Sequence, residues 1–182
     1  MPHVQLINLK ETSGTSHAIL NDINTAFGAT PNMFRAVANS TAALNSMWSA
    51  FAALGSGVIP AKLGEQIAVA IANHNQCEYC LAAHTVLGQK AGASTAEMAA
   101  AQSGNSHDAK TDAVLKFTLK VVSQRAQISQ DDVETLRSHG YDDEHIVEIM
   151  AHVALNLYTN YINVALDVPM DFPKIKLTTT PA

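Results

Sequence analysis

Two cysteines and a histidine lie three and four residues apart in the segment Cys77-Glu-Tyr-Cys80-Leu-Ala-Ala-His84. Residues at these spacings share one face of a helix, so the two thiols and the imidazole are expected to stack beside one another. A thiolate next to an imidazole is the arrangement that nucleophilic sulfur chemistry requires. The positive end of a helix dipole further favours the thiolate. The spacing therefore predicts thiol chemistry on Cys77, Cys80 and His84.

A carboxylate, Glu65, precedes this group by twelve residues. On one unbroken helix, steps of about 100° per residue would leave it about 120° away from the cysteine face. The run Asn-His-Asn at 73–75 interrupts the pattern, and a helix break there would let the Glu65 helix fold back toward the thiols. Glu65 could then accept a proton directly or through water, His84 or Tyr79.

Three other interpretations of these residues stay open at this point. The cysteines can be ordinary buried core residues. With His84 and either Glu65 or His74 they can supply four zinc ligands, although the usual second pair of cysteine or histidine ligands is missing. Glu65 can also form a structural ion pair with Arg35 or Lys62.

The elements that must position these residues are helical in the sequence pattern. Capping residues, helix-ending glycines and three prolines divide the chain into segments of helical periodicity. No run of alternating residues is bounded by hairpin turns, and residues 4–9 are the one candidate strand. The fold class is therefore all-α. The predicted helices cover about 16–28, 31–39, 41–54, 60–73, 76–92, 107–125, 129–140 and 142–168, with a further one starting at the capping box of Ser94 and Glu97.

The length of 182 residues predicts one domain, 1–182, with a core over about 25–175 and peripheral ends. A shift of 83 residues lays Glu65 on Glu148 and the two cysteines on Asn160 and Asn163. This match is explained either by a duplicated helical hairpin, in which one copy kept the chemistry, or by chance among alanine-rich helices.

Composition excludes several classes of protein. The formal charge is −5 and no dense Lys/Arg cluster occurs, so nucleic acid is not an expected partner. No apolar run reaches the ~18–20 residues of a membrane span, and the first residues do not resemble a signal peptide. Two closely spaced cysteines in such a chain indicate a reducing compartment, and the predicted location is cytoplasmic. Because no glycine-rich phosphate loop follows a strand, no nucleotide or flavin cofactor is expected.

The pattern of a glutamate, eleven residues, Cys-x-x-Cys, three residues and a histidine resembles the signature of the AhpD-like (carboxymuconolactone decarboxylase) superfamily. The segments GATPNMFR at 28–35, NYIN at 160–163 and DFP at 171–173 are similar to its peroxidase-related branch. The resemblance covers about residues 25–175. It implies an AhpD-like helical bundle and a homo-oligomer, built from dimers or assembled as a trimer or hexamer.

The resemblance also implies the chemistry of an alkylhydroperoxidase, an antioxidant peroxidase with a redox-active disulfide. By this resemblance Cys80 attacks the hydroperoxide and becomes a sulfenic acid, which Cys77 resolves to a disulfide. A dithiol reductant, lipoyl or thioredoxin-like, then reduces the disulfide, while Glu65 and His84 act in the proton relay. No cofactor and no metal are implied. Tyr79 stands where the best-known members carry a histidine, and with a usual pKa of about 10 it is a poorer relay, although its hydroxyl can still pass a proton.

The helix dipole would activate the more N-terminal thiol, Cys77, whereas the resemblance assigns the attack to Cys80. We follow the resemblance, because a local base can outweigh a dipole effect of about 0.3–1 kcal/mol. Two alternative functions remain. One is a thiol–disulfide oxidoreductase or redox-sensing oligomer without strong peroxidase activity. The other is lactone decarboxylation of the carboxymuconolactone type, which needs no thiol pair.

Overall fold

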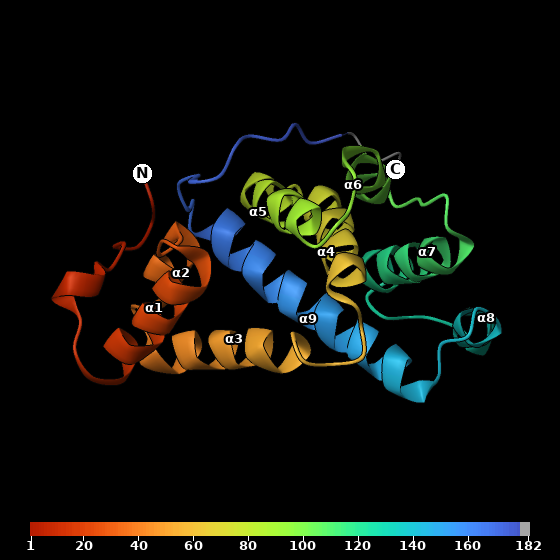
Figure 1. Ribbon diagram of the computed structural model, residues 1–182, viewed down its shortest axis with the longest axis horizontal. Coiled ribbons are helices and arrows are strands. Elements are labelled where there is room, and N and C mark those ends of the chain that lie inside the picture. Colours follow the sequence, from red (N-terminus) through yellow and green to blue (C-terminus); the bar gives the residue numbers. More distant parts are fainter. Residues whose placement is uncertain (179–182) are drawn as a thin grey trace.

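The computed structural model describes residues 1–178, and every regular element in that part of the chain is helical (Figure 1). The predicted all-α class is confirmed. The candidate strand at 4–9 forms no strand and leads into a short 3-10 helix instead. The elements are η1 (Leu9–Glu11), α1 (Gly14–Phe27), α2 (Asn32–Val37), α3 (Thr41–Leu54), α4 (Ala61–His74), α5 (Glu78–Lys90), α6 (Thr95–Gln102), α7 (Ala109–Ser123), α8 (Gln130–Ser138) and α9 (Asp143–Ala165).

The longest helix, α9, runs diagonally through the molecule, with α1–α3 on one side and α4–α7 on the other (Figure 1). It contacts α2 and α3 on the first side and α4, α5 and α7 on the second. Among residues 1–178, no helix is both long enough and apolar enough to cross a membrane.

Helix α4 is the central element, because it packs against α5, α6, α7 and α9 together. A helix surrounded on all sides needs apolar or small side chains around its whole circumference. The sequence of α4 meets this requirement with a continuous buried run from Gln66 to Asn73. Glu65, which directly precedes that run, is thus carried on a firmly held helix.

The chain reverses direction between α4 and α5 at the predicted interruption. Gln76 adopts a left-handed backbone conformation with φ of 56°, and the Cys77 N–H donates back to the carbonyl of Ala72 at 2.8 Å. Such bonds satisfy the free carbonyls at the end of a helix. Cys77 then becomes the N-cap of α5, which begins at Glu78, two residues after the predicted start. The two helices therefore form a hairpin.

The shift of 83 residues does not correspond to a second hairpin. The positions that it aligns with α4 and the start of α5 lie on one continuous helix, α9, from Asp143 to Ala165. The alternative of a duplicated hairpin is therefore wrong, because nothing in α9 interrupts the helical hydrogen bonds at the position equivalent to Gln76.

Candidate active site

The two thiols meet at the first turn of α5. Cys77 is the N-cap residue, and its Sγ accepts a hydrogen bond from the backbone N–H of Cys80 at 3.3 Å. Both side chains are buried, with exposed fractions of 1% and 2%, and both are free thiols. The structure thus places the predicted thiol pair in direct contact, out of bulk water.

The protonation of the pair is unequal. The pKa of Cys77 is lowered, mainly by a hydrogen bond with the Cys80 thiol. Burial acts to raise this pKa, and the backbone N–H groups of Cys80 and Tyr79 lower it further. Burial and the neighbouring Cys77 raise the pKa of Cys80, and hydrogen bonds from Asn163 and Thr159 oppose this rise in part. Of the two thiols, Cys77 is therefore the one that loses its proton more readily, and Cys80 is the one that holds it more tightly. This is the order that the position at the helix start favours.

Glu65 and His84 are brought together by the hairpin, with Glu65 Oε2 2.7 Å from His84 Nδ1. Their side chains are 23% and 11% exposed. The close approach of the helices depends on Gly88, since a Cβ at that position would lie 2.5 Å from Met98 Cε and 3.3 Å from Glu65 Cβ. The carboxylate therefore contacts the histidine one turn beyond Cys80, and not the sulfur atoms themselves.

Cys80 and His84 share a small, largely apolar cavity of about 40 Å³. Cys77 does not line it. Four aromatic rings pack together around this region, with Phe34 at the centre, 5.8 Å from Trp48 and 5.9 Å from both Phe27 and Phe51. A ligand in this cavity would meet one sulfur and one imidazole in apolar surroundings. The other lining residues are Phe27, Pro31, Met33, Phe34, Phe51, Tyr79, Ala83, Leu87, Asn163 and Phe172.

A second cavity, of about 160 Å³, lies on the Glu65 side of His84 and is also lined by His152 and Asn156. His84 lines both cavities. Burial lowers the pKa of His152, and its Nε2 lies 4.0 Å from a Glu148 oxygen without a hydrogen bond to any described residue. The Glu65–His84 pair thus separates an apolar cavity at the thiol from a more polar one.

Tyr79 lies beside the thiols, but its hydroxyl is engaged elsewhere. It accepts a hydrogen bond from the Met33 N–H at 3.2 Å, and the ring packs edge-on against Phe172 with centroids 5.6 Å apart. Burial and a hydrogen bond with Asp171 raise the pKa of this tyrosine well above its usual value. Asp171 also accepts from the Asn32 N–H at 2.6 Å. The hydroxyl therefore ties the start of α2 to the chain after α9, close to the cavity.

The residue that the sequence reasoning did not single out is Asn163 of α9. Its Nδ2 donates to Cys80 Sγ at 3.2 Å, and both groups are buried. In the sequence it was noted only within NYIN and as the partner of Cys80 in the shift of 83. A further signal was available, because Asn156, Thr159, Asn160 and Asn163 form a polar stripe on one face of the second half of the helix, whose other residues are apolar or tyrosine.

The structural ion pair proposed for Glu65 does not form. Lys62 bonds to Glu97 at 2.5 Å, and Arg35 bonds to Asn32 Oδ1 at 2.9 Å and to the carbonyls of Ile7 and Leu6. The zinc set is not assembled either, since within residues 1–178 no three His, Cys, Asp or Glu side chains are grouped to hold a metal ion.

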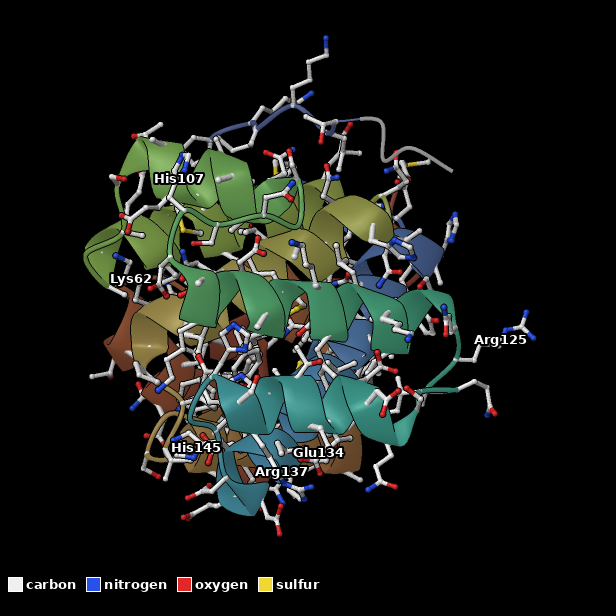
Figure 2. The ribbon with its side chains drawn as sticks, turned by 90° about the vertical axis from the view of Figure 1, so that its right-hand side faces the viewer. Lys62, His107, Arg125, Glu134, Arg137 and His145 are labelled. Carbon is white, nitrogen blue, oxygen red and sulfur yellow. The ribbon has the colours of Figure 1, made fainter. Side chains whose placement is uncertain are left out.

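The face built by α7 and α8 carries charged side chains and histidines (Figure 2). Arg137 of α8 bonds there to Glu134 at 2.5 Å and to Asp143 at 2.6 Å. Lys62 and His145 line a cleft of about 340 Å³ with Glu97. Lys62 and Glu97 pair with each other in this cleft, and neither cysteine lines it.

Comparison with known proteins agrees with this fold. Residues 38–124 match the carboxymuconolactone decarboxylase family. No match was found among the curated proteins. The fold is similar to that of a peroxidase-related protein from Silicibacter sp. TM1040, with a TM-score of 0.80 and 23% identity over 92% of this chain and 91% of that one. A peroxidase-related protein with an alkylhydroperoxidase AhpD core, from Ralstonia eutropha JMP134, gives a TM-score of 0.86 and 22% identity over 93% and 92%.

The debrominase Bmp8 has a related fold as well, with a TM-score of 0.74 and 19% identity over 86% of each chain. A variant of that enzyme was solved with 2,3,4-tribromopyrrole. The match over residues 38–124 agrees with the resemblance seen in the sequence to the AhpD-like (carboxymuconolactone decarboxylase) superfamily, and the two peroxidase-related neighbours share the fold of this chain. The debrominase shows that this fold carries more than one chemistry.

Proposed function

We propose that this protein is a thiol-dependent peroxidase that reduces alkyl hydroperoxides through a Cys77–Cys80 disulfide cycle. The observation that carries the proposal is that Cys80 and His84 line one apolar cavity, while Glu65 holds His84 and Cys77 contacts Cys80. The site thus holds a nucleophile, a base, a carboxylate that orients the base, and a resolving thiol.

In the proposed reaction the Cys80 thiolate attacks the terminal oxygen of the hydroperoxide. The S–O bond forms as the O–O bond breaks, sulfur supplies the two electrons, and the alkoxide leaves as an alcohol after taking a proton. The Cys77 thiolate then attacks the sulfenic sulfur, so that the S–S bond forms as the S–O bond breaks. The hydroxide leaves as water by taking a proton from solvent, which balances the proton that Cys77 released when it became a thiolate. Overall, one hydroperoxide and two thiols give one alcohol, one water and one disulfide.

Access to the cavity supports Cys80 as the attacking thiol despite its raised pKa. Cys77 carries the lower pKa but does not line the cavity. A buried thiolate without a path to substrate cannot react, whereas Cys80 needs only to lose one proton. Cys77 is well suited to the second step, because a stabilised thiolate in contact with the sulfenic acid can attack it at once.

The Glu65–His84 pair is the proposed acceptor of the Cys80 proton. With Nδ1 of His84 engaged by Glu65, the neutral ring has Nε2 left as its acceptor. The second cavity lies behind this pair and offers a polar environment through which the proton can leave. We assign Tyr79 a positioning role, since its hydroxyl stays protonated and holds the Met33 N–H.

The proposed partners follow from this cycle. The apolar lining favours small apolar hydroperoxides, and a dithiol of the lipoyl or thioredoxin-like type must return the disulfide to two thiols. No cofactor is required in this scheme. The cytoplasm, where such dithiols are kept reduced, is the proposed location.

The test is stopped-flow consumption of tert-butyl hydroperoxide by pre-reduced protein, with thiols counted before and after. One peroxide consumed for two thiols lost is the expected result. Thiols that stay reduced under excess peroxide would refute the peroxidase. Disulfide exchange without peroxide consumption would instead support the thiol–disulfide oxidoreductase, and lactone decarboxylation that survives loss of both cysteines would support the decarboxylase.

A homo-oligomer is also proposed, through the outer face of α9. Val147, Tyr161 and Val164 are exposed apolar side chains on this helix, at 68%, 63% and 53%. The face that includes positions 147, 151, 154, 158, 161 and 165 has the alternating spacing of three and four residues that pairs helices. A second copy of the chain would cover it. Sedimentation velocity is expected to show a dimer or larger species, which the substitution Tyr161→Glu dissociates. A wild-type protein that sediments as a monomer would exclude the homo-oligomer.

A further inference from the structure

The side-chain amide of Asn163 is buried, with 4% of the residue exposed, and its two ends are used unequally. Nδ2 donates to Cys80 Sγ at 3.2 Å, whereas Oδ1 is fully buried and has no hydrogen-bond partner among the described residues. A buried polar atom without a partner costs stability and is uncommon in folded proteins. This unpaired acceptor therefore needs a functional explanation.

The position of the amide indicates what it could bind. Asn163 lines the same cavity as Cys80 and His84. Asn160 accepts from Asn75 at 3.1 Å, and Thr159 donates to the carbonyl of Asn156 at 3.1 Å. Thr159 also interacts with Cys80, but neither it nor Asn160 lines the cavity. Asn163 is thus the polar residue of α9 that both touches the reacting sulfur and opens on the substrate cavity.

We propose that Asn163 is a catalytic residue with two roles, and this inference rests on the proposed peroxidase function. Its N–H stabilises the Cys80 thiolate, and its free Oδ1 accepts the hydrogen of the terminal O–H of the bound hydroperoxide. An amide presents a donor and an acceptor side by side, and this pair matches a sulfur anion next to a hydroxyl. The oxygen that the sulfur attacks is thereby held against it.

The same contact serves the product of the first step. When the S–O bond forms and the O–O bond breaks, the hydroxyl that was on the peroxide becomes the hydroxyl of the Cys80 sulfenic acid. The O–H of the sulfenic acid can keep donating its hydrogen bond to Oδ1, so the sulfenic acid is held in place until Cys77 attacks the sulfur. The hydroxide then takes a proton and departs as water. Asn163 neither gains nor loses a proton in this sequence.

Two substitutions separate the roles. Asn163→Leu is similar in size and removes both donor and acceptor, and Asn163→Asp keeps acceptor oxygens but removes the amide donor. Asn160→Leu is the matched control, because it makes the same change one turn earlier on α9, at a side chain that bonds to Asn75 and, within residues 1–178, hydrogen-bonds to neither thiol. Thermal unfolding by circular dichroism checks that each variant is folded.

The first measurement is the pH dependence of Cys80 thiolate absorbance at 240 nm and of its alkylation by iodoacetamide, in a Cys77→Ser background. Because the N–H of Asn163 favours the thiolate, both Asn163 variants are expected to move the midpoint to higher pH, and Asn160→Leu to leave it unchanged. A midpoint that does not move in either Asn163 variant overturns the donor role. Since no peroxide is used, this result does not depend on the peroxidase function.

The second measurement is the single-turnover rate with tert-butyl hydroperoxide at a pH above all the midpoints, where every protein is in the thiolate form. Asn163→Leu is expected to remain about 100-fold slow, the lower end of the effect of losing one oriented group in an oxyanion site. Asn163→Asp should be less impaired. Equal rates for wild type and Asn163→Leu overturn the acceptor role, whereas a wild-type protein that does not react at all overturns the peroxidase function while the thiolate measurement still judges Asn163.

Discussion

The α4–α5 hairpin and helix α9 carry related residues at a constant separation of 83, yet they do different work. In the hairpin, Glu65 and His84 meet at 2.7 Å beside Cys80. In α9, Glu148 and Asn163 are fifteen residues apart on one straight helix, about 22 Å at 1.5 Å per residue. The Glu148 carboxylate accepts hydrogen bonds from the backbone N–H groups of Val58 and Ile59, at 2.9 and 2.7 Å.

The difference between the two regions comes from the backbone between the glutamate and the thiol. The left-handed Gln76 reverses the chain in the hairpin, so that a carboxylate from one helix reaches a histidine on the next. Helix α9 has no such residue, and its glutamate and asparagine bond to different segments of the chain, Glu148 to residues 58–59 and Asn163 to Cys80. Asn163 nevertheless meets its counterpart Cys80 directly. The continuous helix therefore supports the site that the broken one creates.

The largest expected effect on peroxide consumption comes from replacing Cys80, the attacking thiol of the hairpin. Cys80→Ser should reduce peroxide consumption to the background rate, because the nucleophile is removed while the fold keeps a group of similar size. Cys77→Ser should still consume one equivalent and stop at a sulfenic acid, which dimedone labelling followed by mass spectrometry detects. Peroxide turnover by the Cys80 variant would show that Cys77 attacks instead.

The two glutamates provide a matched test of the comparison. Glu65→Gln is expected to slow the peroxide reaction by about 100-fold, the lower end of what a positioned acid–base group contributes. Glu148→Gln should leave that rate unchanged but lower the free energy of unfolding by about 2 kcal/mol, because charge-assisted bonds to two backbone N–H groups are weakened. Stopped-flow rates and urea unfolding of both variants are the measurements.

The opposite pattern, with a slow Glu148→Gln and an unaffected Glu65→Gln, would contradict the assignment. A fall in stability for both variants with no change in rate would mean that each glutamate is structural.

The sequence was sufficient to predict the helical class, the break near residues 73–75 and the residues of the hairpin that meet. These features depend on local signals, namely periodicity, capping residues and a run of Asn, His and Asn that fits poorly in a helix. The contact between Asn163 and Cys80 depends on how α9 packs across α5, and no local signal encodes that packing. The same limit applies to Tyr79, whose hydroxyl partners come from α2 and from the chain after α9.

The contribution of Glu148 to stability should depend on pH. Burial acts to raise the pKa of Glu148, but the N–H bonds from Ile59 and Val58 outweigh it, so the pKa lies below its usual value of 4.5. A carboxyl whose pKa is lower in the folded state stabilises the fold at pH above its unfolded pKa and loses that contribution as the pH falls through the folded value.

The stability difference between wild type and Glu148→Gln is therefore expected to be full at pH 7 and to shrink below about pH 4.5. Urea midpoints measured between pH 7 and pH 3 follow it, and the other carboxyls cancel because both proteins contain them. A difference that stays constant over this range would mean that the charge of Glu148 does not contribute.

The smallest expected effect on activity is that of Tyr79→Phe, which asks whether the hairpin relay includes this tyrosine. Since the raised pKa keeps the hydroxyl protonated at working pH, the substitution should change the peroxide rate less than about threefold and leave its pH profile unmoved. It should cost about 1 kcal/mol of stability, because the buried Met33 N–H loses its acceptor. Tyr141→Phe is the control, a buried tyrosine outside the site whose hydroxyl makes no hydrogen bond within residues 1–178. If Tyr79→Phe slows the reaction as much as Glu65→Gln does, the hydroxyl passes the proton and the relay runs through Tyr79 rather than through Glu65 and His84 alone.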